Sequence, residues 1–216
     1  MIDKRVTDLA AAVAGLRDGA TILYSGFGSV GEPLELIHAV FDLGVRDLIV
    51  VSNNAGVGET GLARLIKAGR VRKVVCSFAR TSRPHADDGT PIEIEMVPQG
   101  TMSERIRAGA AGIAGFYTRV SAGTALAAGK EVRDFDCAAH VLERPIKGDI
   151  ALIRADRADR WGNLVYRKTA RNFNPVMAMA AAVTAVQVRE VVELGALDPE
   201  LIHTPGLFVD RVVQVA

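Results

Sequence analysis

The sequence predicts one α/β domain over residues 1–216, built on an open, mainly parallel sheet with flanking helices. Short apolar runs alternate with longer amphipathic runs, which is the pattern of strands joined by crossover helices. A length of 216 residues suits one sizeable core and is short for two. We find no internal repeat and no linker rich in Pro, Gly or Ser, so the alternation continues along the whole chain.

The first half of the chain predicts four strands and four helices in alternation. Pro33 suits the first turn of the second helix and Gly44 its end. Thr101 and Glu104 have the spacing of a capping box, so the fourth helix is expected to begin at Thr101. The expected strands are 21–24, 47–52, 71–78 and 93–97, and the expected helices are 5–16, 35–43, 61–68 and 101 to about 110.

The second half predicts a denser group of strands. We expect strands at 140–143, 149–154 and 163–166, a helix from 174 to about 182, and final strands at 185–192 and 207–215. Four turns, 25–33, 53–60, 98–101 and 171–175, are expected between strands and helices. Gly and Asn in such turns are ordinary turn formers. Because parallel strands place these turns at one edge, four together favour a ligand-binding crevice.

Composition excludes several classes of partner. A formal net charge of +1 gives no reason to expect nucleic acid or an anionic membrane surface. No apolar run approaches the ~20 residues of a membrane span, and the first residues are unlike a signal peptide. Cys76 and Cys137 lack C-x-x-C spacing, which favours a reducing cytoplasm. The histidines show no metal-ligand spacing, so no metal site is expected.

Residues 26–31 have the G-x-G-x-x-G spacing that dinucleotide-binding proteins use. That fingerprint also needs an acidic residue at the end of the second strand, about 20 residues on. Here that strand ends in Ser-Asn-Asn at 52–54, and Asp47 lies at its start. Glu32 at the following helix start would repel a pyrophosphate, although it suits the helix dipole. We therefore reject a nicotinamide nucleotide.

The same loop follows a different signature. The segments that match this signature are Asp18-Gly19, Ile22-Leu23-Tyr24, Ser25-Gly26-Phe27, Gly31 and Pro33. Together they resemble the signature of family I CoA-transferases, with two departures. Tyr24 replaces an aliphatic residue, and Ser25 replaces the first glycine of a pair. A side chain at position 25 is expected to narrow the approach of a ligand, or to shift the backbone if that glycine had positive φ.

Further words extend the resemblance from the first helix to the last strand. They include 52–56 (SNNAG), 71–78 (VRKVVCSF), 97–101 (VPQGT), 103–109 (SERIRAG), 129–133 (GKEVR), 161–167 (WGNLVYR) and 170–173 (ARNF). Within the family, the likeness is greatest to the A subunits of 3-oxoadipate and succinyl-CoA:3-ketoacid CoA-transferases. The resemblance implies a CoA-transferase-like fold, a CoA thioester as substrate, and no bound cofactor.

The resemblance also implies a partner chain. Family I enzymes use a glutamate as a covalent nucleophile, which in two-subunit members lies on the B subunit near a Glu-Asn-Gly word. This chain has no such word. Glu32 and Glu59 are better interpreted as acids at helix starts. We therefore expect activity only with a B subunit, in an αβ or α2β2 assembly.

Gln99 is the expected catalytic residue of this chain. The family analogy implies that its amide donates to the oxyanion of the tetrahedral intermediate, beside a positive helix end. A Gln that only satisfies a turn is the alternative. Asn53 and Asn54 are candidate donors to the ligand, or else side chains of Asx-turns. The expected substrate and CoA loop contributes Ser25, Gly26, Phe27, Gly28 and Gly31.

The acid substrate is the least constrained part of the prediction. Arg80, Arg83 and Arg119 are candidates to bind its carboxylate, or else solvated surface residues. They favour 3-oxoadipate, which keeps a second carboxylate, over acetoacetate. The segments 80–93 and 117–129, however, depart from the relatives. An acyl-CoA hydrolase on the same scaffold and a non-catalytic ligand-sensing module remain alternatives to a succinyl-CoA-dependent transferase.

Overall fold

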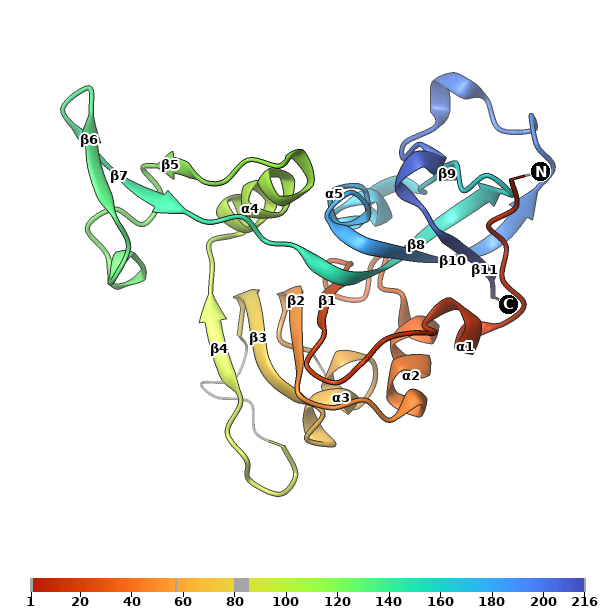
Figure 1. Ribbon diagram of the computed structural model, residues 1–216, viewed down its shortest axis with the longest axis horizontal. Coiled ribbons are helices and arrows are strands. Elements are labelled where there is room, and N and C mark those ends of the chain that lie inside the picture. Colours follow the sequence, from red (N-terminus) through yellow and green to blue (C-terminus); the bar gives the residue numbers. More distant parts are fainter. Residues whose placement is uncertain (1, 57, 80–85, 216) are drawn as a thin grey trace.

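The computed structural model describes residues 2–56, 58–79 and 86–215. A main sheet of eight strands has the order β11-β10-β8-β1-β2-β3-β4, and β9 pairs with β8 (Figure 1). Every pair along that order is parallel, and only β9 is antiparallel. This confirms the predicted α/β fold. The strands are β1 (Thr21–Tyr24), β2 (Leu48–Asn54), β3 (Val71–Phe78), β4 (Glu93–Met96), β8 (Gly148–Asp159), β9 (Leu164–Val165), β10 (Ala181–Val192) and β11 (Arg211–Gln214).

Helices cover both faces of the main sheet. They are α1 (Leu9–Ala12), α2 (Leu34–Leu43), α3 (Leu62–Lys67), α4 (Gln99–Ala111) and α5 (Asn174–Ala178). Successive side chains of a strand point to opposite faces, so Ile22 packs with α1–α3 and Leu23 with α4 and α5. Two apolar cores result, one on each face. In the described part of the chain, every helix is too short or too polar to cross a membrane.

A second, three-stranded sheet extends away from the main sheet (Figure 1). It consists of β5 (Phe116–Thr118), β6 (Val132–Phe135) and β7 (Ala138–Glu143), in the order β5-β7-β6, and both pairs are antiparallel. Asp136 and Cys137 join β6 to β7, with φ of 50° and 61°. Positive φ at both positions is the geometry of a type I′ hairpin turn. We call this sheet the arm; β5 and β6 were not expected from the sequence.

Two predicted helix starts are wrong. The first helix, expected over 5–16, spans only Leu9–Ala12, because Asp8 caps it and Arg5 bridges to Val212 instead. The capping box at Thr101 is also wrong, because α4 begins two residues earlier, after Pro98. Thr101 is therefore buried inside the first turn, and its hydroxyl has no hydrogen-bond partner.

Element ends in the second half also differ from the expectation. The helix that begins at 174 ends at Ala178, and β10 already begins at Ala181. β10 therefore begins within an Ala-rich run, and the hydrophobic periodicity of such a run does not distinguish a strand from a helix. The last strand is shorter than 207–215, because residues 206–208 form a 3-10 helix before β11.

Candidate active site

The carboxyl ends of β1 and β2 lie side by side at one edge of the main sheet. Leu23 pairs with Val51, so two residues further on Ser25 and Asn53 reach the same level. Neighbouring strands are about 4.8 Å apart, which places the two turns in reach of one ligand. The carboxyl ends of β3 and β4 continue this edge towards α4.

The loop after β1 is a compact turn that depends on glycine. Phe27 and Val30 exchange two backbone hydrogen bonds of 3.0 and 3.2 Å across Gly28. Gly31 has φ of +71°, and a Cβ there would lie 2.7 Å from the carbonyl oxygen of Ala170. Only glycine fits this approach without a shift of the backbone. The loop is thereby held against the segment that precedes α5.

Ser25 and Asn174 form a buried polar pair beneath this loop. Ser25 is 1% exposed, and its hydroxyl donates a hydrogen bond of 2.6 Å to Oδ1 of Asn174. The same Oδ1 accepts from the backbone N–H of Arg154 at 2.7 Å. Nδ2 of Asn174 donates to the carbonyls of Ala170 (2.8 Å) and Gly31 (3.2 Å). Ser25 has no positive φ, so the expected shift of the backbone does not occur, and its side chain supports the loop through Asn174.

Tyr24 and Glu32 account for the other departure in this loop. The Tyr24 hydroxyl donates to Oε1 of Glu32 at 2.6 Å. Burial, together with the adjacent Glu32 carboxylate, raises the pKa of Tyr24 well above its usual range. Glu32 is thus engaged by Tyr24 and faces Gly61, where a Cβ would lie 2.7 Å from its Oε1. Glu59 instead pairs with Lys67 on α3. In neither case does the structure show the carboxylate capping a helix.

Gln99 lies where its amide can donate to a bound ligand. It is the first residue of α4, and its Nε2 donates to Oδ1 of buried Asn53 at 3.0 Å. An amide nitrogen has two N–H groups, so one remains for a ligand. Pro98 caps the helix with no side-chain hydrogen bond, so the first N–H groups of α4 are also open to an anion. The arrangement suits an oxyanion or a carboxylate.

The other predicted residues have different positions. Asn54 is half-buried at the end of β2, and Phe27 is 48% exposed at the rim of the loop. Arg119 is exposed in the turn after β5, on the arm, which extends away from the main sheet (Figure 1). Arg80 and Arg83 lie outside the described residues.

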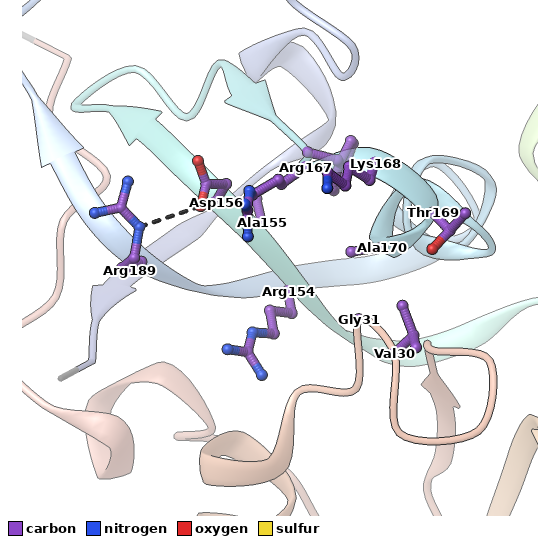
Figure 2. A pocket seen from close by; sticks show the side chains of 11 residues that line it. Val30, Gly31, Arg154, Ala155, Asp156, Arg167, Lys168, Thr169, Ala170 and Arg189 are labelled. Carbon is purple, nitrogen blue, oxygen red and sulfur yellow. Dashed lines mark hydrogen bonds and ion pairs between the residues drawn. The ribbon is translucent and has the colours of Figure 1, made fainter.

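A basic pocket that the sequence analysis did not identify opens beside the loop after β1 (Figure 2). Its volume is about 630 Å³, and its charged lining residues are Arg154, Asp156, Arg167, Lys168 and Arg189. Arg189 Nε donates to Asp156 Oδ1 at 3.1 Å, across the β8–β10 pair. The basic run at residues 167–171 was the one signal in the sequence that could have predicted it.

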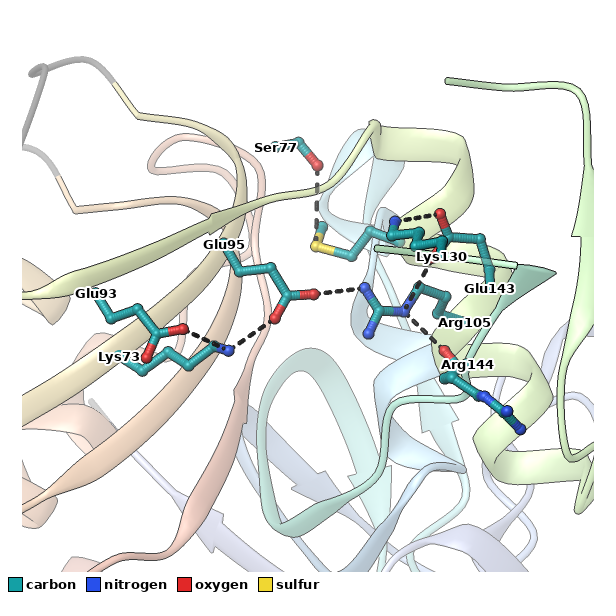
Figure 3. A network of polar contacts seen from close by, with 9 residues as sticks. Lys73, Ser77, Glu93, Glu95, Arg105, Lys130, Glu143 and Arg144 are labelled. Atoms are coloured by element: carbon teal, nitrogen blue, oxygen red, sulfur yellow. Dashed lines mark hydrogen bonds and ion pairs between the residues drawn. The ribbon is translucent and has the colours of Figure 1, made fainter. Parts of the chain in front are cut away.

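An ionic network joins α4 to the sheet edge and to the arm (Figure 3). Arg105 on α4 contacts Glu95 at 2.7 Å, and Lys73 contacts the same carboxylate at 2.9 Å. Burial alone would raise the pKa of Glu95, but Arg105 and Lys73 outweigh it and lower the pKa. On the arm, Glu143 is 2% exposed and accepts from Lys130 at 2.6 Å. The network fixes the helix whose first residue is Gln99.

The described residues offer few other reactive groups. Burial raises the pKa of the Cys76 thiol to about 11, so it is a core residue and a poor nucleophile. No group of three or more His, Cys, Asp or Glu side chains that could hold a metal ion occurs within residues 2–56, 58–79 and 86–215. The site is therefore built from amides, a helix start and glycine-dependent turns.

Known proteins share both the sequence and the fold. Residues 6–215 match the family described as Coenzyme A transferase. The chain is 54% identical over 220 residues to the A subunit of the 3-oxoadipate CoA-transferase of Pseudomonas putida, covering 100% of this chain and 95% of that protein. It is 46% identical over 215 residues to the A subunit of the succinyl-CoA:3-ketoacid coenzyme A transferase of Helicobacter pylori strain J99. That match covers 99% of this chain and 93% of the Helicobacter protein.

The fold is also that of a solved acyl-CoA transferase. The enzyme YdiF of E. coli O157:H7, crystallised as a thioester complex with CoA, superposes with a TM-score of 0.85 at 24% identity. The match covers 99% of this chain and 50% of that one, so this chain spans half the length of that enzyme. At this identity the likeness shows the fold alone.

Proposed function

The chain belongs to the coenzyme A transferase family, and we propose that it is the A subunit of an enzyme that moves CoA from succinyl-CoA to a 3-oxo acid. The names of the similar subunits support this assignment. One observation carries the role of this chain: Gln99 presents an amide at the start of α4 and is anchored by Asn53. The site thus supplies donors, and the nucleophile is expected from a B subunit.

In the proposed reaction, a glutamate of the partner attacks the thioester carbonyl. The carbonyl oxygen becomes an oxyanion, which Gln99 stabilises by donating its free N–H. Collapse expels CoA as thiolate and leaves an acyl-glutamyl anhydride. The thiolate then attacks the glutamyl carbonyl, releases the carboxylic acid and forms a glutamyl-CoA thioester. Attack by the acceptor carboxylate and a second exchange return the glutamate and give the new acyl-CoA.

The acceptor is proposed to be 3-oxoadipate, with acetoacetate second. The 54% identity to a chain named for 3-oxoadipate supports this order. A second carboxylate would need a cation, for which Arg119 on the arm, Arg80 and Arg83 remain candidates. The assembled enzyme should turn over 3-oxoadipate with the higher kcat/KM. Higher efficiency with acetoacetate, unchanged when each arginine is replaced by Ala, would contradict the substrate and its stated cause.

The function is tested by reconstitution. The purified chain alone should show no transfer, and mixing it with its B subunit should restore transfer from succinyl-CoA. With succinyl-CoA and no acceptor acid, intact mass spectrometry should find CoA bound covalently to the B subunit. Turnover by the single chain, or an adduct on a residue of this chain such as Glu59, would refute the division of roles. Steady release of CoA without an acceptor would identify a hydrolase instead.

We also propose a cytoplasmic location and an αβ or α2β2 assembly. The free thiols of Cys76 and Cys137 support a reducing compartment. Light scattering on the reconstituted complex distinguishes the two assemblies by mass.

A further inference from the structure

The basic pocket carries more positive charge than its own residues neutralise. Asp156 is its one acidic lining residue, and Arg189 already binds that carboxylate. Among the described residues, no hydrogen bond or ion pair engages the side chains of Arg154, Arg167 or Lys168. Three cations therefore line a concave space of about 630 Å³ without a counter-ion (Figure 2). Like charges held together in this way favour a polyanion over a single carboxylate.

We propose that this pocket binds the phosphates of the CoA thioester. The inference rests on the proposed function, since that function makes a CoA thioester the substrate. CoA carries a diphosphate and a ribose phosphate at one end and the thioester at the other. A diphosphate and a phosphate match three cations, whereas the carboxylate of an acid substrate matches one.

The position of the pocket fits a long ligand that reaches Gln99. Arg154 lies on β8 two residues beyond Leu152, which pairs with Tyr24 at the end of β1. β8 is two strands from β2, which carries Asn53, so the backbones of Arg154 and Asn53 are separated by roughly 10 Å along the sheet. Their side chains lie on opposite faces, Arg154 on the α2 side and Asn53 on the α4 side, so the ligand would pass over the carboxyl end of β1. The pantetheine arm would span this edge, passing the loop whose Val30 and Gly31 also line the pocket.

The backbone around the pocket is held in an unusual way. Lys168 has φ of 52°, a backbone conformation that residues other than Gly, Asn and Asp rarely adopt. The N–H of Arg154 is bound by Asn174, which is 0% exposed. Strained residues persist where the surrounding structure fixes them, and they are frequent at ligand sites. Arg154 on β8 and Lys168 after β9 therefore come from two separate segments that meet at the pocket.

The test compares phosphate-bearing and phosphate-free ligands on the assembled complex with its B subunit. The variants are Arg154→Gln and Lys168→Asn, because Asn tolerates positive φ. Arg17→Gln is the matched control, since Arg17 is exposed and precedes β1 at the opposite end of the strands. Calorimetry with CoA and with pantetheine measures affinity, and initial rates with succinyl-CoA and succinyl-pantetheine measure KM and kcat.

Each pocket variant should weaken CoA about 5- to 20-fold and raise KM for succinyl-CoA similarly, with kcat unchanged. Pantetheine affinity, the KM for succinyl-pantetheine and the control should stay within twofold. Equal losses for CoA and pantetheine, or no loss for CoA, would overturn the proposal. Loss of the B subunit from the variants at unchanged CoA affinity would also overturn it, by showing an acidic partner surface in the pocket. If the complex shows no CoA transfer but the pocket variants still weaken CoA binding, the proposed function fails and the assignment of the pocket stands.

Discussion

Replacing Asn174 by Leu should destabilise the chain strongly, because it keeps the branched shape of the side chain but removes every polar atom. Asn174 accepts hydrogen bonds from Ser25 and Arg154 and donates to Ala170 and Gly31, at 2.6 to 3.2 Å. Each such bond contributes roughly 1 kcal/mol net, and the loss leaves polar groups buried. We therefore expect a loss of about 3–5 kcal/mol in the free energy of unfolding. At 2–4 °C per kcal/mol for a chain of this size, the midpoint should fall by roughly 6–20 °C.

The assay is urea and thermal unfolding followed by circular dichroism. Ser25→Ala is the matched control, because it removes one of these bonds and leaves Oδ1 of Asn174 satisfied by Arg154. It should cost about 1 kcal/mol. A loss below about 1 kcal/mol for Asn174→Leu, or equal losses for the two variants, would refute the assignment of Asn174 as the residue that holds these segments together.

Three further predictions follow from the site and its supports. Gln99→Ala should lower kcat of the assembled enzyme about 10²–10³-fold with little change in KM, and a change under threefold would remove Gln99 from the mechanism. Gly31→Ala should lower the free energy of unfolding by at least about 2 kcal/mol, because position 31 has positive φ and a Cβ there would meet the carbonyl of Ala170. Gly28 also has positive φ but has open space around it, so Gly28→Ala should lower the free energy of unfolding less. Equal losses in thermal unfolding would contradict this. The folded-state pKa of Glu95 is lowered, so the ionised carboxylate stabilises the folded chain. In urea unfolding, wild type should be more stable than Glu95→Gln at pH 7 and should lose that advantage as the pH falls below about 4. An advantage that grows on acidification would contradict the direction of the pKa shift.

Much of the main sheet could be predicted because its strands are buried. The runs at 21–24 and 71–78 have the bounds that were expected, since each contains three consecutive buried residues, 22–24 and 74–76. The arm could not be predicted in the same way. All four residues of β6 are exposed, so no apolar alternation marks the strand. Its pairing depends on the turn at Asp136 and Cys137, which is not one of the common Asn-Gly or Asp-Gly turns.

The candidate site could also be predicted only in part. Gln99 and Asn53 could be predicted to meet, because strand ends in a parallel sheet share one edge; their roles with substrate stay predictions. Asn174 was missed as a hub, because its contact with Ser25 joins residues 149 positions apart. The basic pocket was missed because its cations come from β8, from β10 and from the run at 167–168. A linear pattern does not show which charges share a concave space.

The arm has a consequence for how the chain opens. Its apolar contacts leave much of the surface exposed: the rings of Tyr117 and Phe135 lie 5.1 Å apart with a tilt of 59°, and Phe135 remains 43% exposed. Lys130 and Glu143 supply a charge pair in place of a shared core. Regions with little buried apolar area unfold locally at a lower free energy than the whole domain. Backbone amides of β6 and β7 should therefore exchange with deuterium faster than those of β1 and β2, as a separate cooperative unit.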